Sequence, residues 1–226
     1  MSGPAVINVA HKPVTTLKVN EIFYSLQGES RSSGFPTLFI RLTGCPLRCQ
    51  YCDTAYAFHD GTSMTLSAVL AAVRTYQPRF ITVTGGEPLA QKGCHALLTS
   101  LCDAGYEVSL ETSGALDISQ VDPRVVRVLD IKTPGSGEVE KNLYHNITQL
   151  DSKDQVKFVI CDEQDYQWAK QTIDEHNLAS VCEILFSPSY QQLEAVKLAD
   201  WILADRLHVR MQIQLHKVLW GDVPGK

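Results

Sequence analysis

CPLRCQYC, at residues 45–52, holds three cysteines in a C-x3-C-x2-C spacing directly after an apolar run. Thiolates so spaced cannot share one face of a regular helix, whereas a loop can wrap them around one metal centre. They are soft ligands that suit an iron–sulfur cluster or zinc. A structural zinc site takes four protein ligands, and the next candidate, His59, does not match the common zinc-finger spacings. Three cysteines leave one iron of a four-iron cluster open to another molecule, while a zinc site with a distant fourth ligand is the alternative.

The composition around this loop is that of an ordinary globular protein. The chain has 226 residues, of which 44% are hydrophobic and 20% charged, enough for one α/β domain with a sizeable core. The formal net charge of -5 disfavours broad electrostatic binding of nucleic acid. No apolar run approaches the roughly 20 residues that cross a bilayer, and residues 1–16 lack an export signal. We therefore expect a cytoplasmic protein with no membrane or nucleic-acid partner, whose cysteines are reduced thiols.

Short apolar runs alternate with helical patterns along the chain. Runs rich in β-branched and aromatic residues predict strands at 37–42, 79–84, 106–111, 125–131, 155–160, 182–186 and 208–213. Helices are predicted at 65–77, 90–104, 138–150, 162–177 and 190–206. In the last of these, one apolar stripe is expected from Leu193, Val196, Ala199, Leu203 and Leu207. The alternation predicts an α/β fold whose mostly parallel sheet is either open or closed into a barrel.

Unusual polar and glycine-containing segments follow the predicted strands. TGGEP at 84–88 ends the second strand, ETSG at 111–114 ends the third, and KTPGSGE at 132–138 and SPSY at 187–190 follow later ones. Ligand sites of parallel α/β folds gather at the carboxyl ends of the strands, so these segments should meet the cysteine loop at one edge. Two adjacent glycines allow a backbone to approach a ligand closely.

The cysteine loop, TGGEP and ETSG, in this order, resemble the signature of the radical S-adenosylmethionine (SAM) superfamily. The resemblance implies a reduced partial (β/α) barrel of the radical SAM type with about six core parallel strands. It also implies a [4Fe–4S] cluster on Cys45, Cys49 and Cys52, whose open iron chelates SAM and which, when reduced, cleaves SAM to a 5′-deoxyadenosyl radical. The SAM-binding residues implied are Gly85, Gly86, Glu87, Ser113, Asp130, Lys132, Thr133 and Ser187. No catalytic residue beyond the cluster and SAM is implied.

NEIFYSLQGES at 20–30 and QLHKVLW at 214–220 narrow the resemblance. From about residue 18 to 220 the chain is similar to the 7-carboxy-7-deazaguanine synthase family. The implied reaction is the ring contraction of 6-carboxy-5,6,7,8-tetrahydropterin to 7-carboxy-7-deazaguanine, with loss of ammonia, in queuosine and 7-deazapurine biosynthesis. The family also implies Mg²⁺, a homodimer, and an electron donor such as flavodoxin. Residues 1–226 are expected to be a single domain, with an N-terminal arm at 1–17 and a C-terminal tail at 215–226 that closes the site.

This second resemblance assigns the substrate side of the site. The substrate-binding residues implied are Leu26, Gln27, Gly28, Glu29, Arg41, Thr84 and His216. A guanidinium fork suits the pterin carboxylate, although Arg41 in an apolar strand is also explained by pairing with a nearby acidic residue. Thr54 matches the position of a Mg²⁺ ligand, and a turn or helix-capping residue is the alternative.

Two other functions compete with this interpretation. A small radical SAM activase, which makes a glycyl radical on a protein partner, would share the cluster and TGGEP but would need neither LQGE nor Arg41. A zinc-dependent binding module would use the same three cysteines for structure alone.

Overall fold

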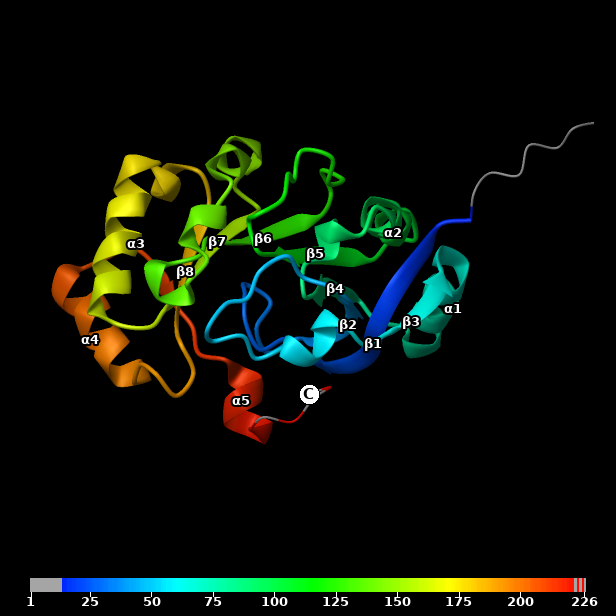
Figure 1. Cartoon of the computed structure of the whole chain (residues 1–226), viewed down its shortest axis with the longest axis horizontal. Coiled ribbons are helices and arrows are strands. Elements are labelled where there is room, and N and C mark those ends of the chain that lie inside the picture. Colours follow the sequence, from blue (N-terminus) through cyan, green and yellow to red (C-terminus); the bar gives the residue numbers. More distant parts are fainter. Residues whose placement is uncertain (1–13, 222, 224, 226) are drawn as a thin grey trace, which may run out of the picture.

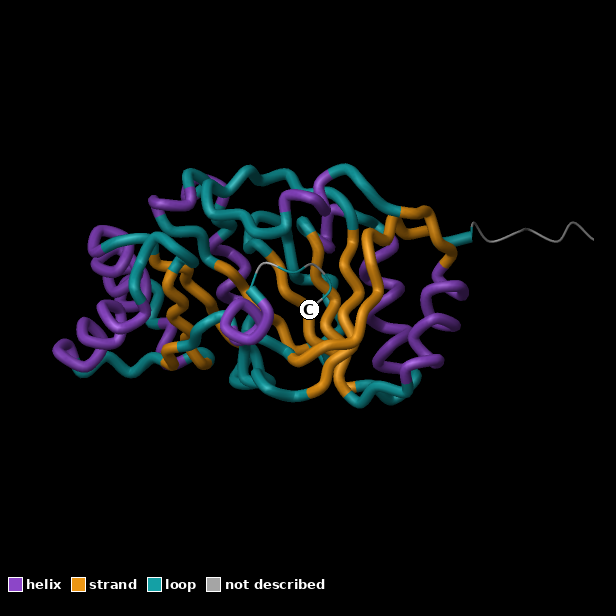
Figure 2. The backbone as a smooth tube through the Cα atoms, turned by 90° about the horizontal axis from the view of Figure 1, so that it is seen from below, coloured by secondary structure: helices purple, strands orange, loops and turns teal. Residues whose placement is uncertain are grey.

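The computed structural model describes residues 14–221, 223 and 225, so most of the expected N-terminal arm lies outside the described residues. These residues form a nine-stranded sheet in the order β3-β1-β2-β4-β5-β6-β7-β8-β9, whose edge strands do not pair with each other (Figures 1 and 2). β1 (Thr16–Leu26) pairs antiparallel with β2 and with β3 (Thr62–Thr65). The parallel strands are β2 (Pro36–Leu42), β4 (Phe80–Gly85), β5 (Glu107–Thr112), β6 (Val126–Asp130), β7 (Gln155–Ile160), β8 (Glu183–Pro188) and β9 (Arg210–Met211). The expected α/β partial barrel is confirmed, and its sheet is open.

In the described part of the chain, four α-helices lie between the strands and a fifth follows them. They are α1 (Leu66–Tyr76), α2 (Gly93–Asp103), α3 (Glu163–Glu175), α4 (Ala195–Asp205) and α5 (Leu215–Trp220). The side chains of Thr65 and Asp162 cap α1 and α3 by accepting hydrogen bonds from backbone N–H groups of the first turn. Figure 1 shows α1 and α2 at one end of the sheet, and α3 and α4 beside β7 and β8 at the other. Among the residues described, no helix is long and apolar enough to cross a membrane.

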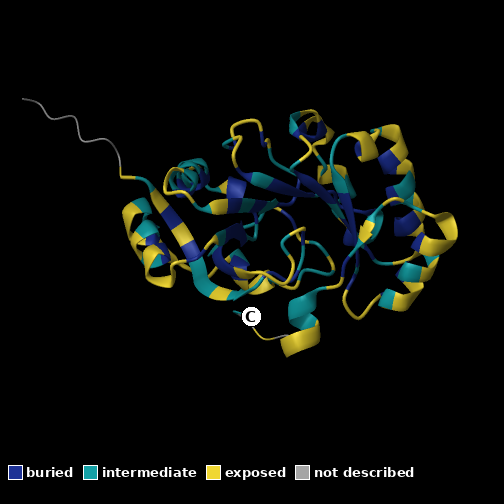
Figure 3. Cartoon of the chain, turned by 180° about the vertical axis from the view of Figure 1, so that it is seen from behind, coloured by how far each residue is buried: buried dark blue, intermediate teal, exposed yellow. Residues whose placement is uncertain are grey.

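Side chains alternate along each strand, so that those on one face pack in the core and those on the other face can line a cavity. In β7, Val156, Phe158 and Ile160 are fully buried in the hydrophobic core, whereas Lys157 and Val159 point the other way and line a cavity. Figure 3 shows the buried strands inside and the exposed faces of the helices outside. The side chains that stabilise the fold and those available for chemistry therefore leave the same strand in opposite directions.

The prediction of one helix at 138–150 is wrong. This segment contains only two 3₁₀ helices, η4 (Val139–Lys141) and η5 (Tyr144–Gln149). Asn142 accepts a hydrogen bond from the backbone N–H of Lys132 and donates to its carbonyl, both at 2.8 Å. Asparagine side chains that bond to the backbone in this way compete with helix formation, and here they tie the segment to the loop after β6 instead.

The apolar stripe expected at 190–206 is also wrong. α4 begins only at Ala195 and buries Leu198 and Ile202, while Val196 is 63% and Leu203 is 73% exposed. Spacings of three and four residues fit two neighbouring faces of this helix, and the sequence pattern alone selected the outer one. Two strands were missed, β1 and β3, and the last predicted strand at 208–213 shortens to β9.

Candidate active site

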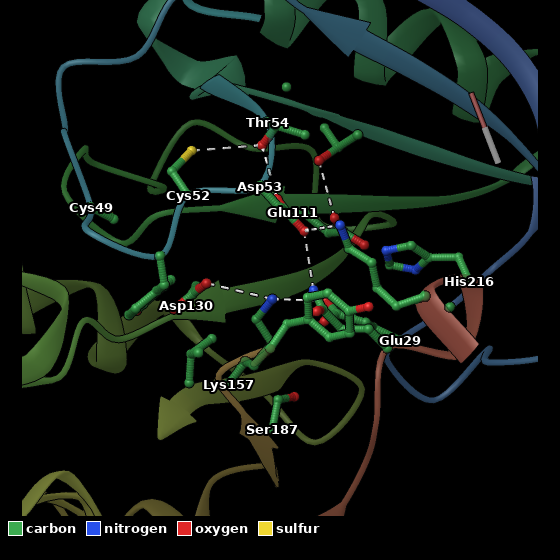
Figure 4. Close-up of a pocket in the computed structure, with 18 of the residues that line it drawn as sticks. Glu29, Cys49, Cys52, Asp53, Thr54, Glu111, Asp130, Lys157, Ser187 and His216 are labelled. Atoms are coloured by element: carbon green, nitrogen blue, oxygen red, sulfur yellow. Dashed lines mark hydrogen bonds and ion pairs between the residues drawn. The ribbon is translucent and has the colours of Figure 1, made fainter. Parts of the chain in front are cut away.

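A cavity of about 840 Å³ lies at the carboxyl ends of the parallel strands. It is bounded by the LQGE segment after β1, the cysteine loop, the ends of β4 to β8 and helix α5 (Figure 4). Most of the residues that the sequence assigned to the site line it, namely Leu26, Gln27, Gly28, Glu29, Arg41, Cys45, Cys49, Cys52, Thr54, Thr84, Gly85, Gly86, Ser113, Asp130, Lys132, Ser187 and His216. The cavity therefore brings together segments that are far apart in the chain.

The three cysteines lie on one wall of this cavity as free thiols. In the described part of the chain no three His, Cys, Asp or Glu side chains converge closely enough to hold a single metal ion. A mononuclear zinc site needs its thiolates about 2.3 Å from one point, whereas a four-iron cluster takes each cysteine at a different iron, so its ligands stand farther apart. Burial raises the pKa of Cys49 to about 11. A thiol in this environment gives up its proton to a bound metal rather than to water.

The cysteine loop is held from the other side by the loop after β6. The backbone N–H of Gln50 donates to the carbonyl of Ser136 at 3.0 Å, and that of Arg48 donates to the Glu138 carboxylate at 2.5 Å. The TGGEP turn packs on the same loop: a Cβ on Gly86 would lie 2.7 Å from the Cβ of Cys45. Glycine is required at this position because no larger residue would fit between the turn and the cysteine loop.

Glu87 and Thr133, two of the expected SAM-binding residues, do not line the cavity. The fully buried Glu87 carboxylate accepts hydrogen bonds from the backbone N–H of Ser113 at 2.7 Å and of Leu89 at 2.9 Å, and from the Thr112 and Ser113 hydroxyls. It therefore joins the ends of β4 and β5 and has no free edge for a ligand.

Thr133 is likewise turned away from the cavity. Its hydroxyl lies 2.9 Å from the Asp165 carboxylate, which also accepts from the backbone N–H groups of Gly135 at 2.8 Å and Cys161 at 3.0 Å. Asp165 is itself buried, so it fixes the loop that in turn holds the cysteine loop. Thr133 therefore bonds to this support of the loop and does not line the cavity.

Charged side chains meet on the cavity floor, around Lys157. Its ammonium donates to Glu29 at 2.8 Å and lies 3.5 Å from Asp130, which Lys132 also approaches to 3.0 Å (Figure 4). Burial raises the pKa of Asp130, but Lys132 and Lys157 more than offset this, and its pKa lies below its usual value. Sequence reasoning missed Lys157, although a lysine inside an otherwise apolar strand was a visible signal.

Glu111 lies on the same floor, and its hydrogen-bond partners among the described residues are uncharged. Its carboxylate accepts from Gln27 at 3.2 Å and from the Thr84 hydroxyl at 3.0 Å. Burial raises the pKa of Glu111, and the neighbouring positive charge of Lys157 reduces that shift. A carboxyl group of this kind can hold a proton at a higher pH than a solvent-exposed one.

Arg41 faces the cavity from β2 and is paired within the protein. Its Nε donates to Glu21 at 2.7 Å, and its guanidinium carbon lies 5.5 Å and 5.7 Å from the ring centres of Phe23 and Tyr56. The alternative of an acidic partner is therefore observed. Within the described residues only the Nε of Arg41 makes a hydrogen bond, so its two terminal nitrogens point to no protein acceptor.

Thr54 and His216 also line the cavity. The Thr54 hydroxyl caps no helix and lies 3.3 Å from the Asp53 carboxylate. His216, on α5, packs on Gly28 so closely that a Cβ on that glycine would collide with its Nδ1, and the N–H of Leu215 donates to the Gly28 carbonyl at 3.0 Å. Burial lowers the pKa of His216. Helix α5 thus docks directly onto the LQGE segment.

Comparisons with known proteins identify the family of this chain. The sequence profile of the radical SAM superfamily matches residues 39–179, so the chain is a radical SAM protein, a class that uses a [4Fe–4S] cluster and SAM. It is 47% identical to a 7-carboxy-7-deazaguanine synthase of Chlorobaculum tepidum, over 91% of this chain and 94% of that protein. A 7-carboxy-7-deazaguanine synthase of Methanospirillum hungatei is 40% identical, over 93% of this chain and 89% of that protein. The chain therefore belongs to the 7-carboxy-7-deazaguanine synthase family.

A solved structure gives the same fold. QueE from Escherichia coli superposes with a TM-score of 0.73, at 22% identity, over 89% of this chain and 95% of that one. Both rival functions, the glycyl-radical activase and the zinc-dependent binding module, are disfavoured by the family to which the chain belongs.

Proposed function

We propose that this chain converts 6-carboxy-5,6,7,8-tetrahydropterin to 7-carboxy-7-deazaguanine, with loss of ammonia, in queuosine biosynthesis. The observation that carries the proposal is the single cavity in which the cysteine loop faces the LQGE segment and Arg41. The relatives that share this chain over most of its length bear the name of this activity.

The cluster and SAM belong on one side of this cavity. Cys45, Cys49 and Cys52 hold the cluster, and the backbone of Gly85 and Gly86 faces SAM. Asp130 supports SAM binding through its Oδ1, which is buried and makes no hydrogen bond to any described residue. The remaining SAM contacts are Lys132, Ser113 and Ser187, which line the same wall. When bound, the reduced cluster and SAM together supply a 5′-deoxyadenosyl radical.

The substrate occupies the opposite side. The terminal nitrogens of Arg41 bind the pterin carboxylate as a fork, with Glu21 keeping the guanidinium in place. Leu26, Gln27, Gly28 and Thr84 form the wall against the ring, and His216 closes it. Thr54 contributes its hydroxyl to Mg²⁺, an ion that prefers oxygen ligands and retains several waters.

The proposal also covers the oligomeric state of the protein and its source of electrons. The protein functions as a cytoplasmic homodimer and receives electrons from a donor such as flavodoxin. The donor approaches at the exposed side of the cysteine loop, where Pro46, Arg48 and Gln50 lie at the surface.

The test is turnover by anaerobically reconstituted protein given SAM, Mg²⁺, a reductant and the carboxy-tetrahydropterin. We expect the deazaguanine product, about four irons per chain, and regenerated SAM. Arg41→Ala should abolish turnover without changing the iron content, while Arg79→Ala, whose side chain is 74% exposed, should turn over like the wild type. Cleavage of SAM without a deazaguanine product would contradict the assignment of the substrate. Stoichiometric zinc in place of iron would contradict the assignment of radical SAM chemistry.

A further inference from the structure

Lys157 is a buried cation to which the proposed function assigns no role. It stands at the centre of β7, and its side chain is 13% exposed, with the apolar residues on both sides of it turned into the core. Burying an ammonium is costly unless it is paired, so a lysine here needs partners.

Two of the three N–H directions of Lys157 are occupied. One meets Glu29 Oε2 at 2.8 Å and another lies 3.5 Å from Asp130 Oδ2. An ammonium has three donors, and within the described residues Lys157 has no third acceptor. Because Lys157 also lines the cavity, its third N–H is available to a ligand there.

The surroundings keep this group charged. Burial alone would lower the pKa of Lys157, but Glu29, Asp130 and Glu111 hold it well above its usual range. Lys157 is therefore charged at neutral pH and can act as a hydrogen-bond donor.

Glu29 and Lys157 together present a fixed pattern to the cavity. The Glu29 carboxylate is 12% exposed and offers acceptors, and the ammonium bonded to it offers a donor beside them. The edge of a 2-amino-4-oxo ring has the complementary order: a 2-amino donor, an N3–H donor and a 4-oxo acceptor.

We propose that Lys157 is the residue that selects the 4-oxo group of the pterin, by donating its third N–H to that oxygen while Glu29 accepts from the 2-amino group and N3–H. The inference rests on the proposed function and adds to it a determinant of substrate class. A ring with an amino group at position 4 would set that donor against the Lys157 ammonium, and it also lacks the N3–H that Glu29 accepts. Leaving these groups unpaired is an effective way for a polar site to reject an analogue.

The experiment measures the affinity of two unreactive probes for the reconstituted protein with SAM bound. Pterin-6-carboxylate carries the 4-oxo group, and 2,4-diaminopteridine-6-carboxylate carries an amino group in its place. The second probe also lacks N3–H, so the wild type should prefer the first through both Glu29 and Lys157. Lys157→Met should reduce that preference by about 10- to 100-fold, the value of one hydrogen bond to a charged group, and leave the part that depends on N3–H.

The matched control is Lys153→Met, because Lys153 pairs with Asp151 outside the cavity and precedes the same strand. It should keep the full preference. Lys157→Gln serves if the methionine variant does not fold, since its amide can bond to Glu29 yet can present either a donor or an acceptor to the ring. Measurements of iron content and SAM affinity check that each variant still binds the cluster and SAM.

The possible results distinguish failure of the Lys157 inference from failure of the proposed function. An unchanged 4-oxo preference in the Lys157 variants overturns the inference while leaving the proposed function intact. Loss of affinity for both probes by the same factor also overturns it, because a merely structural lysine gives that result. Failure of the wild type to bind either probe contradicts the proposed function itself.

Discussion

Replacing Glu87 by glutamine separates a structural role from the direct SAM contact that the sequence motif implies. In the structure the carboxylate is 0% exposed and accepts hydrogen bonds from Leu89, Thr112 and Ser113. Glutamine has nearly the same shape, but its NH₂ group cannot accept. The bonds made to one of the two oxygens are therefore lost.

The magnitude follows from those bonds. A hydrogen bond to a charged group contributes about 1.5–3 kcal/mol, and on the Oε2 side two donors of Ser113 would face an NH₂ group. Rotation of the Ser113 hydroxyl to accept from that group returns about 1 kcal/mol. Glu87→Gln should therefore lower the free energy of unfolding by about 2–5 kcal/mol, a large fraction of the stability of a typical domain.

The assay is urea unfolding of the cluster-free protein without SAM, in which a direct ligand role has no effect. The midpoint should fall while the slope stays constant. Glu107→Gln is the control, because Glu107 is 56% exposed at the other end of β5 and should change stability by less than about 1 kcal/mol. If Glu87→Gln is too unstable to purify, Thr112→Val removes one donor only and should cost about 1.5–3 kcal/mol. A cluster-free Glu87→Gln protein as stable as the wild type, with SAM affinity alone reduced, would refute the reasoning.

Three further predictions follow from the packing and charges of the site. Gly28→Ala should reduce turnover at least about tenfold with normal iron content, because its Cβ collides with His216 and displaces α5; wild-type turnover would contradict this. Asp165→Ala should lower the unfolding free energy by on the order of 4 kcal/mol and speed cluster loss to a chelator, since it removes the acceptor of Gly135 and two other donors; unchanged chelation kinetics would argue against the link to the cysteine loop. Because burial raises the pKa of Glu111, its contribution to stability should be complete below about pH 4.3 and decline as pH rises through its folded pKa. Urea titrations should then show the wild type losing stability relative to Glu111→Gln as pH rises, and a difference independent of pH would exclude the shift.

The sequence predicted where the site lies but not the direction of every side chain in it. Within a strand, alternation fixes which side chains share a face, so Arg41 shares a face with Phe39, and both line the cavity. Beyond the last paired residue that rule ends. Glu87 and Thr133 lie just after strands, and their directions depend on hydrogen bonds to Ser113 and Asp165, residues 26 and 32 positions further along the chain.

The errors in the helices have a related cause. The pattern at 190–206 contains enough apolar residues for two faces, and the face that packs is chosen by contacts with β8 and with the ring of Tyr166, 5.3 Å from that of Trp201. At 138–150, Asn142 bonds to the backbone of a residue ten positions earlier. Neither choice is encoded in local periodicity, because each depends on a partner outside the window.

Lys157 shows why a charge inside an apolar strand carries more information than its local pattern. Its ammonium is stable there only because Glu29, 128 positions earlier, and Asp130, on the adjacent strand β6, are both within reach. Glu29 belongs to the wall proposed for the substrate, and Asp130 to the wall proposed for SAM. A ligand that draws one carboxylate away from the lysine strengthens its pairing with the other, since the same charge is shared between them. Because one buried ion-pair network joins the two proposed walls, we expect occupancy of either wall to change the electrostatic environment of the other.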